Sequence, residues 1–267
     1  MILVRTVAEV RSALADARAA GQSISLVPTM GAFHAGHLAL MAASRAADDV
    51  VVVSLFVNPA QFGPSEDLAR YPRDEEADAA AAEAADVDVL FVPPVEEMYP
   101  PGFDTWVDPG ELATVLEGAV RPGHFRGVAT VCTRLFAIVQ PARAYFGRKD
   151  AQQVAVIKQL VRDLALPLEI VACPTVRDPD GLALSSRNRY LSPEERAVAL
   201  ALPRALEAGL AAYRNGGDPV DTAEEVLAAT PELTVDYVTV ADLDGPTLAA
   251  AVRVGSMRLI DNLELRA

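Results

Sequence analysis

The sequence has few of the residues that mark several common protein classes. Its 267 residues include 2 cysteines, 3 histidines, and 23 lysines and arginines against 37 aspartates and glutamates, which gives a formal net charge of −14. A general nucleic-acid binder needs a basic surface to meet phosphate backbones, so this charge argues against that class. A small anionic ligand remains compatible with it, because a few cations can focus a local positive field inside an acidic protein.

Disulfide scaffolds and membrane proteins are also disfavoured. Cys132 and Cys173 lie far apart and form no CxxC pair, so we expect two small buried apolar side chains and a reducing, cytoplasmic location. The N-terminal segment MILVRTVAEVR carries charges where the apolar core of a secretion signal would run. The longest apolar stretches fall well short of the ~20 residues that a membrane span needs, and we expect no membrane partner.

Apolar strands alternate with helices through the first two-thirds of the chain, which is 51% apolar overall. Strands are predicted at 23–28, 49–59, 87–93, 142–147 and 168–175. Helices are predicted at 37–47, 74–85, 126–140 and 151–165, and from a Thr6–Glu9 capping box to about Ala20. This alternation predicts an α/β fold, a Rossmann-like doubly wound parallel sheet.

The character of the sequence changes after residue 176. Residues 177–189 are rich in turn residues and charge and predict a loop, and a helix follows from its cap at Ser192. Another short helix is predicted after NGGDP, and strands are predicted at 234–240 and 252–260, near a turn at DLDG. We therefore divide the chain into a nucleotide-binding domain, 1–176, and a smaller C-terminal α+β domain, 177–267.

Two of the three histidines, His34 and His37, occur in the stretch MGAFHAGH between a predicted strand and a predicted helix. Gly31 allows a tight turn there, and Gly36 allows close approach of the backbone. Such a turn places helix N–H groups where an anion binds, although no GxGxxG or GxxxxGKS motif is present. The histidines could be structural helix-start residues, a metal pair without a nearby third ligand, or phosphate contacts, and we favour the last interpretation.

Two further polar clusters support a phosphate site. GRKD follows the strand predicted at 142–147 and places Lys149 at a second strand end on the same edge of the sheet. LSSR, at 184–187, offers two hydroxyls and a guanidinium on a loop. Taken singly, a surface lysine and a polar loop are the better explanations. Together with the histidines they suit a triphosphate, with charge developing at a phosphoryl group.

HxGH and the late Ser-Ser-Arg loop resemble the nucleotidylyl-transfer superfamily, in which the loop takes the place of the KMSKS segment of class I aminoacyl-tRNA synthetases. More narrowly, the chain resembles the pantothenate synthetase (pantoate–β-alanine ligase) family. The resemblance covers nearly the whole chain, through VPTMGAFHAGH, VSLFVNPAQFG, YPRD, RPGHFRGVATVC, AYFGRKDAQQ and LALSSRNRYLSPEER in that order. It implies an AMP-forming ligation of (R)-pantoate to β-alanine through a pantoyl adenylate, in pantothenate and coenzyme A biosynthesis. It also implies Mg²⁺ on the ATP phosphates and a homodimer.

The resemblance also implies roles for individual residues. His34, His37 and Lys149 are expected to be catalytic, with His37 as the proton donor. Gln61 and Gln153 are expected to hold pantoate, and Gln61 also borders the β-alanine site. The implied ATP site comprises Met30, Gly31, Ala32, Phe33, His34, Ala35, Gly36, His37, Gly147, Arg148, Lys149, Asp150, Val176, Leu184, Ser185, Ser186 and Arg187. No protein motif for a metal is expected.

Two other functions share these motifs. A nucleotidyltransferase could hand AMP or CMP to a phosphate-bearing acceptor and stop there, although Gln61 and Gln153 disfavour it because a phosphate acceptor would favour cations. A non-catalytic nucleotide-binding module would bind ATP without releasing pyrophosphate. His124 and Arg126, in GHFRG, have no assigned role; Arg126 could neutralise a substrate carboxylate or hold the fold. Asp78 could lie on the surface of a helix and is given no role. The 185–187 loop and the segment 64–67 are candidate lids over a water-sensitive intermediate.

Overall fold

The computed structural model describes residues 1–64 and 66–266. The chain divides into two compact units. The N-terminal unit consists of Met1–Gly147 and Gln152–Cys173, and the C-terminal unit consists of Arg148–Ala151 and Pro174–Ala267. The four residues 148–151 thus belong to the C-terminal unit although the chain on both sides of them belongs to the N-terminal unit.

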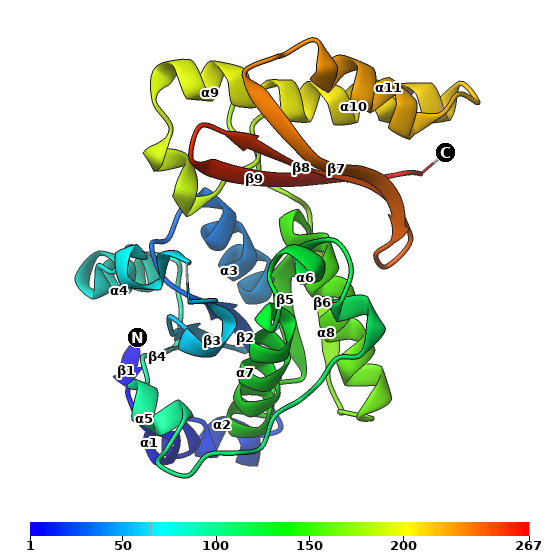
Figure 1. The fold of residues 1–267 in the computed structure, drawn as a ribbon. Helices are drawn as coiled ribbons and strands as arrows, with labels where there is room; N and C mark the ends of the chain where they lie inside the picture. Colours follow the sequence, from blue (N-terminus) through cyan, green and yellow to red (C-terminus); the bar gives the residue numbers. More distant parts are fainter. Residues whose placement is uncertain (65, 267) are drawn as a thin grey trace. The chain divides into compact units, whose positions relative to one another are not determined.

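A parallel sheet forms the centre of the N-terminal unit (Figure 1). Its six strands have the order β1-β4-β3-β2-β5-β6, and every neighbouring pair is parallel. The strands are β1 (Ile2–Val4), β2 (Ile24–Thr29), β3 (Val50–Leu55), β4 (Val89–Phe91), β5 (Arg143–Gly147) and β6 (Glu169–Cys173). The predicted doubly wound sheet is confirmed, and β1 is the strand that was not predicted. Its apolar run, Ile2–Val4, has only three residues, which is too short to predict a strand.

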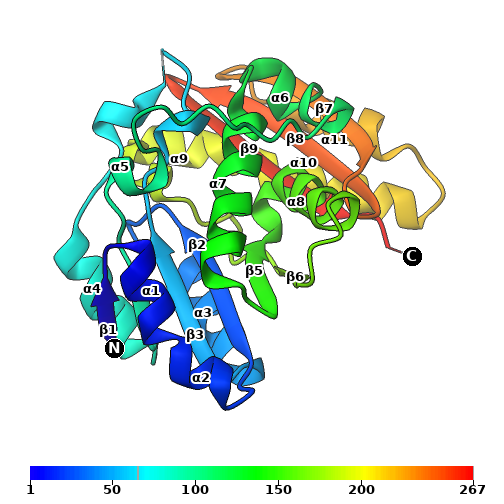
Figure 2. The same ribbon diagram turned by 90° about the horizontal axis from the view of Figure 1, so that it is seen from below.

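Helices cover both faces of this sheet, as Figure 2 shows for α1 and α7 on one side and α3 on the other. The helices of the N-terminal unit are α1 (Val7–Ala13), α2 (Ala15–Ala19), α3 (Ala35–Ala47), α4 (Glu75–Ala84), α5 (Val95–Met98), α6 (Glu117–Val120), α7 (His124–Val139) and α8 (Ala151–Asp163), whose first residue lies in the C-terminal unit. Short 3₁₀ helices of this unit lie at Pro59–Gln61, Asp67–Arg70 and Glu111–Ala113, and a further one, Arg148–Asp150, belongs to the C-terminal unit. Within the described residues, no helix combines the length and the apolar character that a bilayer crossing requires.

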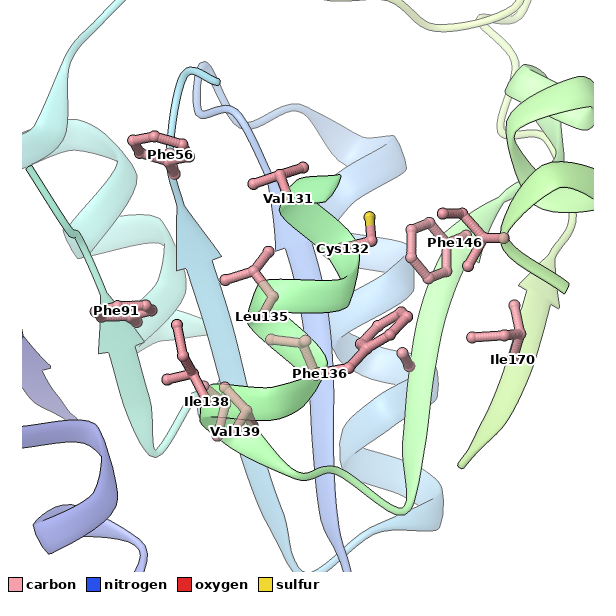
Figure 3. Close-up of a cluster of buried hydrophobic side chains, with 14 of the residues drawn as sticks. Phe56, Phe91, Val131, Cys132, Leu135, Phe136, Ile138, Val139, Phe146 and Ile170 are labelled. Atoms are coloured by element: carbon pink, nitrogen blue, oxygen red, sulfur yellow. The ribbon is translucent and has the colours of Figure 1, made fainter. Parts of the chain in front are cut away.

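The larger core packs α7 against the sheet (Figure 3). Val131, Leu135 and Phe136 of this helix lie in one buried cluster with Phe91 of β4 and Phe146 of β5. Each fully buried side chain of this kind stabilises the fold by about 1.5–3 kcal/mol relative to exposure. Because the packing is rigid, it fixes the strand ends from which the candidate site residues project.

Two predicted elements differ from the observed ones at particular residues. The helix predicted from Thr6 to Ala20 has the predicted capping box but is interrupted at Leu14, where α1 ends and α2 begins. The strand predicted over 49–59 ends at Leu55, because Asn58 caps a 3₁₀ helix that starts at Pro59. Proline supplies no N–H for a strand ladder but suits a helix start.

The C-terminal unit packs helices on an antiparallel sheet (Figure 1). Its elements are the 3₁₀ helix Ser186–Tyr190, α9 (Pro193–Ala199), α10 (Ala201–Arg214), α11 (Pro219–Ala228), β7 (Leu233–Asp242), β8 (Pro246–Val254) and β9 (Met257–Glu264). This confirms the smaller α+β domain. The strand predicted over 252–260 is instead a hairpin: β8 and β9 pair on either side of Gly255, whose φ of 55° suits the turn.

Both cysteines are buried free thiols. Burial raises the pKa of Cys132 to about 12 and also raises the pKa of Cys173. Because the thiolate is the reactive form, neither residue should react with a disulfide reagent such as DTNB in the native protein at pH 8. Unfolding in guanidinium should expose both thiols to the reagent. Rapid labelling of either thiol before unfolding would contradict this prediction.

Candidate active site

The stretch with the two histidines forms the turn between β2 and α3. Its backbone takes left-handed conformations at Gly31, with φ of 90°, and at Ala32, with φ of 53°. A Cβ at Gly31 would also lie 2.8 Å from Oδ2 of Asp78, so this position has no room for a side chain. At Gly36 a Cβ would lie 2.8 Å from the imidazole of His34, so glycine there lets the ring fold back over the helix start. Both glycines are therefore required by the turn itself.

His34 and His37 form a capping box at the start of α3. The N–H of Gly36 donates to Nδ1 of His34 over 3.1 Å, and the N–H of His34 donates to Nδ1 of His37 over 3.4 Å. The two ring centroids are 4.2 Å apart. Both histidines therefore do cap the start of α3, as the structural interpretation predicted. Each imidazole uses only its Nδ1 for these caps.

This capping pattern determines which ring nitrogen carries the proton. A nitrogen that accepts a hydrogen bond has no proton, so the neutral imidazoles of His34 and His37 are assigned as Nε2–H tautomers. Each Nε2 is then a donor suited to an anion. A neutral histidine binds a metal through its unprotonated nitrogen, which here is the capping Nδ1. The caps therefore disfavour the metal interpretation and are compatible with phosphate contact.

Gln61 is held by Asn58, a residue that the sequence analysis did not single out. Nδ2 of Asn58 donates to Oε1 of Gln61 over 3.0 Å and to the carbonyl of Gly127 over 3.2 Å. The hydroxyl of Tyr99 donates to Oδ1 of Asn58 over 2.7 Å, which fixes the Asn58 amide. With Oε1 turned to Asn58, Gln61 presents Nε2 as a donor, 3.1 Å from Sδ of Met30. The spacing in NPAQ, an asparagine cap followed three residues later by glutamine, is the local signal that could have revealed Asn58.

His124 supports the backbone of Gln61. Its Nδ1 lies 2.9 Å from the Gln61 carbonyl, and its Nε2 lies 3.0 Å from Nη1 of Arg121. Because a guanidinium can only donate, Nε2 accepts and Nδ1 donates to the carbonyl. Arg121 also pairs with Glu66 over 2.6 Å. Burial raises the pKa of Glu66, but the hydrogen bonds and charge of Arg121 outweigh it and leave that pKa below its ordinary value.

Arg126, the other unassigned residue of GHFRG, packs on an aromatic cluster. Its guanidinium carbon lies 4.7 Å from the ring centroid of Trp106. Trp106 in turn stacks on Tyr99, with ring centroids 6.2 Å apart. A cation over an indole face is attracted by the π electrons, so this contact gives Arg126 a packing role.

Two adjacent glutamines at the start of α8 have different surroundings. Gln152 is buried, and its Nε2 donates to the carbonyls of Leu112 and Val115, both over 2.8 Å. Its Oε1 accepts from the N–H of Glu117 over 3.0 Å. Gln153, the predicted pantoate residue, is only partly buried in the same turn. Gln152 therefore holds a neighbouring segment in place, whereas Gln153 keeps part of its side chain exposed.

In the C-terminal unit, Asn262 of β9 holds the segment that carries Lys149. Its buried amide donates from Nδ2 to the carbonyls of Arg148 and Lys149, both over 2.9 Å. Lys149 Nζ lies 3.8 Å from Oδ1 of Asp150. The guanidinium of Arg148 is paired with two carboxylates, those of Asp244 and Glu264. The side chain of Arg148 therefore has a structural role. The ammonium of Lys149 has a longer ion pair, so it is held more weakly than the guanidinium of Arg148.

The segment predicted as a loop at 177–189 contains regular hydrogen-bonded structure that its composition did not indicate. The N–H of Leu184 donates to the carbonyl of Val176 over 3.0 Å, which closes the loop at its base. Ser185 caps the 3₁₀ helix Ser186–Tyr190 and accepts from the N–H of Arg187 over 3.3 Å. The Ser-Ser-Arg segment is thus a capped helical turn that can present hydroxyl and guanidinium donors.

The predicted site residues fall into one group in each compact unit. Those of the N-terminal unit are Met30–His37, Gln61, Gly147 and Gln153; those of the C-terminal unit are Arg148–Asp150, Val176 and Leu184–Arg187. In the N-terminal unit the groups that follow β2, β3 and β5 share the carboxyl edge of the sheet, where ligands of open α/β folds bind. The candidate lid at 64–67 includes Ser65, which lies outside the described residues.

The model of the pantoate-beta-alanine ligase family matches residues 2–264. The chain belongs to this family. It is 55% identical to the pantothenate synthetase of Roseiflexus sp. strain RS-1 over all of both chains, and 54% identical to that of Moorella thermoacetica over 99% of each.

Solved structures agree with this result. The crystal structure of pantothenate synthetase from Thermus thermophilus superposes with a TM-score of 0.94 at 50% identity and full coverage of both chains. A pantoate-beta-alanine ligase from Francisella tularensis, complexed with beta-gamma ATP and beta-alanine, superposes with a TM-score of 0.86 at 34% identity. That match covers all of this chain and 98% of the other. The resemblance and the fold class inferred from the sequence are both confirmed.

Proposed function

We propose that this protein condenses (R)-pantoate with β-alanine at the expense of ATP, through a pantoyl adenylate, with release of pyrophosphate and AMP. The observation that carries the proposal is the pair of capped histidines, His34 and His37, in a chain that belongs to the ligase family over residues 2–264. The product is pantothenate, a precursor of coenzyme A.

In the first step a carboxylate oxygen of pantoate attacks the α-phosphorus of ATP. The new P–O bond forms as the bond to pyrophosphate breaks, and pyrophosphate leaves with the bonding electrons. Negative charge grows on the phosphoryl oxygens and on the leaving group. The Nε2–H groups of His34 and His37 and the ammonium of Lys149 are the donors that we assign to this charge, with His37 as the proton donor. Because the substrate carboxylate is the nucleophile, the enzyme needs none of its own.

In the second step the free amine of β-alanine attacks the carbonyl carbon of the adenylate. The C–N bond forms, and AMP leaves with the electrons of the acyl C–O bond. Gln61 and Gln153 hold the pantoyl group through neutral amides, which add no negative charge beside the attacking carboxylate. The hydrogen bond from Asn58 to Oε1 of Gln61 supports this assignment, because it leaves Nε2 of Gln61, which donates to Sδ of Met30 in this structure, as the group that can donate to pantoate.

The remaining parts of the proposal follow from the need to keep water from the acyl adenylate. We assign residues 1–176 to binding nucleotide and pantoate, and residues 177–267 to a domain that covers the site with the Ser185–Arg187 segment. ATP enters as its Mg²⁺ complex. The proposal includes a homodimer in the cytoplasm; the family resemblance supports the dimer, and the two reduced, buried thiols suit the location.

Pyrophosphate release from MgATP tests the function. We expect release stoichiometric with enzyme when (R)-pantoate is added alone, because the adenylate stays bound, and continuous turnover once β-alanine is present. β-Alanine alone and (S)-pantoate are controls that should give no release. ATP binding without any pantoate-dependent release would point instead to a binding module or to another nucleotidyltransferase.

A further inference from the structure

Asp78 lies where the sequence analysis did not place it. The sequence left its role open, with a helix surface as one option, and it is only 4% exposed, on the inner side of α4. The sequence around it, EEADAAAAEA, consists of alanines and acidic residues, so no apolar stripe shows which face of the helix is buried. A buried carboxylate is costly unless it is hydrogen-bonded, and the partners of Asp78 therefore identify what it does.

Those partners are two consecutive backbone groups of the turn before α3. The N–H of Ala32 donates to Oδ2 of Asp78 over 2.8 Å, and the N–H of Phe33 donates to Oδ1 over 2.7 Å. Ala32 is a non-glycine residue with φ of 53°, a conformation that costs energy unless something holds it. The carboxylate spans this strained residue and ties the turn to α4.

The two amides are the kind that would otherwise receive a phosphate. Successive N–H groups in a left-handed turn form an anion-binding concavity, and in this protein a carboxylate of the same chain already fills it. The sequence alone predicts that backbone N–H groups at this turn meet the nucleotide. The N–H groups of Ala32 and Phe33 donate to Asp78 instead, so side chains must make the phosphate contacts at this turn. His34 is the residue that directly follows these two amides.

We propose that Asp78 is a positioning residue for adenylate formation: it holds the Gly31–Phe33 turn so that His34 and His37 keep the geometry that the reaction needs. This inference rests on the proposed function for its kinetic readout. The fit is close, because a Cβ at Gly31 would already lie 2.8 Å from Oδ2 of Asp78. Charge, length and the two acceptor oxygens of aspartate are therefore all required at this position.

The test compares Asp78→Asn with Asp74→Ala. An asparagine can accept from one of the two amides, but its NH₂ group then faces the other N–H as donor against donor. We expect kcat for pyrophosphate release to fall about 10- to 100-fold, as for other small displacements of catalytic groups, with KM for ATP changed less than about threefold. Asp74 caps the same helix through the N–H of Ala77 and does not contact the turn. Asp74→Ala weakens α4 and should leave both parameters near wild type.

Amide hydrogen exchange over residues 30–38 gives a readout that does not depend on activity. Asp78→Asn should speed exchange in that segment of the ligand-free protein, and Asp74→Ala should not. If wild-type protein proves inactive, the proposed function fails while the exchange result still decides whether Asp78 holds the turn. The positioning role is overturned if exchange is unchanged, or if Asp78→Asn lowers only the melting temperature and kcat stays within twofold of wild type.

Discussion

His37→Ala should lower pantoate-dependent pyrophosphate release about 10²- to 10³-fold, the usual cost of removing one preorganised donor from a developing charge. The capping box leaves the proton of His37 on Nε2, and alanine removes that donor. The cap itself is a small part of the fold, so circular dichroism and the melting temperature should show a folded protein. Single-turnover release with MgATP and pantoate is the measurement, because it isolates the adenylation step.

His37→Gln separates the two roles of this side chain. Glutamine is a normal capping residue at this helix position and can still accept from the N–H of His34, while its own NH₂ lies near the place of Nε2–H. If His37 only donates a hydrogen bond, the glutamine variant should recover a large part of the rate lost in His37→Ala. If His37 transfers a proton, both variants should be equally slow. Near wild-type turnover in His37→Ala would make the histidine purely structural.

Gln153→Ala should reduce kcat/KM for pantoate about 10- to 100-fold, since a hydrogen bond to a charged ligand contributes about 1.5–3 kcal/mol. KM for ATP should change less than about twofold, because the assigned ligand of Gln153 is pantoate alone. Initial rates with each substrate varied at saturating concentrations of the others give both numbers. An equal loss of kcat/KM for ATP and for pantoate would contradict the assignment of Gln153 to the pantoate site.

The neighbouring glutamine is a matched control for that experiment. Gln152→Ala removes the same side chain one residue earlier, where it bonds to Leu112, Val115 and Glu117. Leaving these buried groups unpaired should cost about 1–3 kcal/mol of stability and lower the melting temperature. The pantoate KM of the folded variant should remain close to wild type, so the pair of variants distinguishes binding from support.

Local signals in the sequence were enough to predict most of the fold. The run of valines in β3 is apolar on both faces, as a strand buried in a parallel sheet requires. The capping box at Thr6–Glu9 and the helix cap at Ser192 depend on residues close together in the chain and appear where they were predicted. The same holds for the histidine turn, whose glycines and polar side chains are contiguous.

Contacts between distant segments could not be predicted in this way. Asp78 is 46 residues from Ala32, and Asn262 is 113 residues from Lys149. Each is one polar residue in a segment whose composition explains it equally well as surface. Their roles follow only from which elements pack together, and this depends on the whole fold and not on local periodicity.

The three capping boxes within the described part of the chain also have a consequence for engineering it. Thr6–Glu9 and Ser192–Glu195 use the side chains that helix starts favour, whereas α3 begins with imidazoles at the equivalent positions. Serine at 34 and glutamate at 37 would satisfy the same backbone groups at least as well. A selection or design scheme that rewards only thermal stability would therefore drift toward those residues and return a robust, inert protein. Any such scheme must keep both histidines fixed or screen for turnover in parallel.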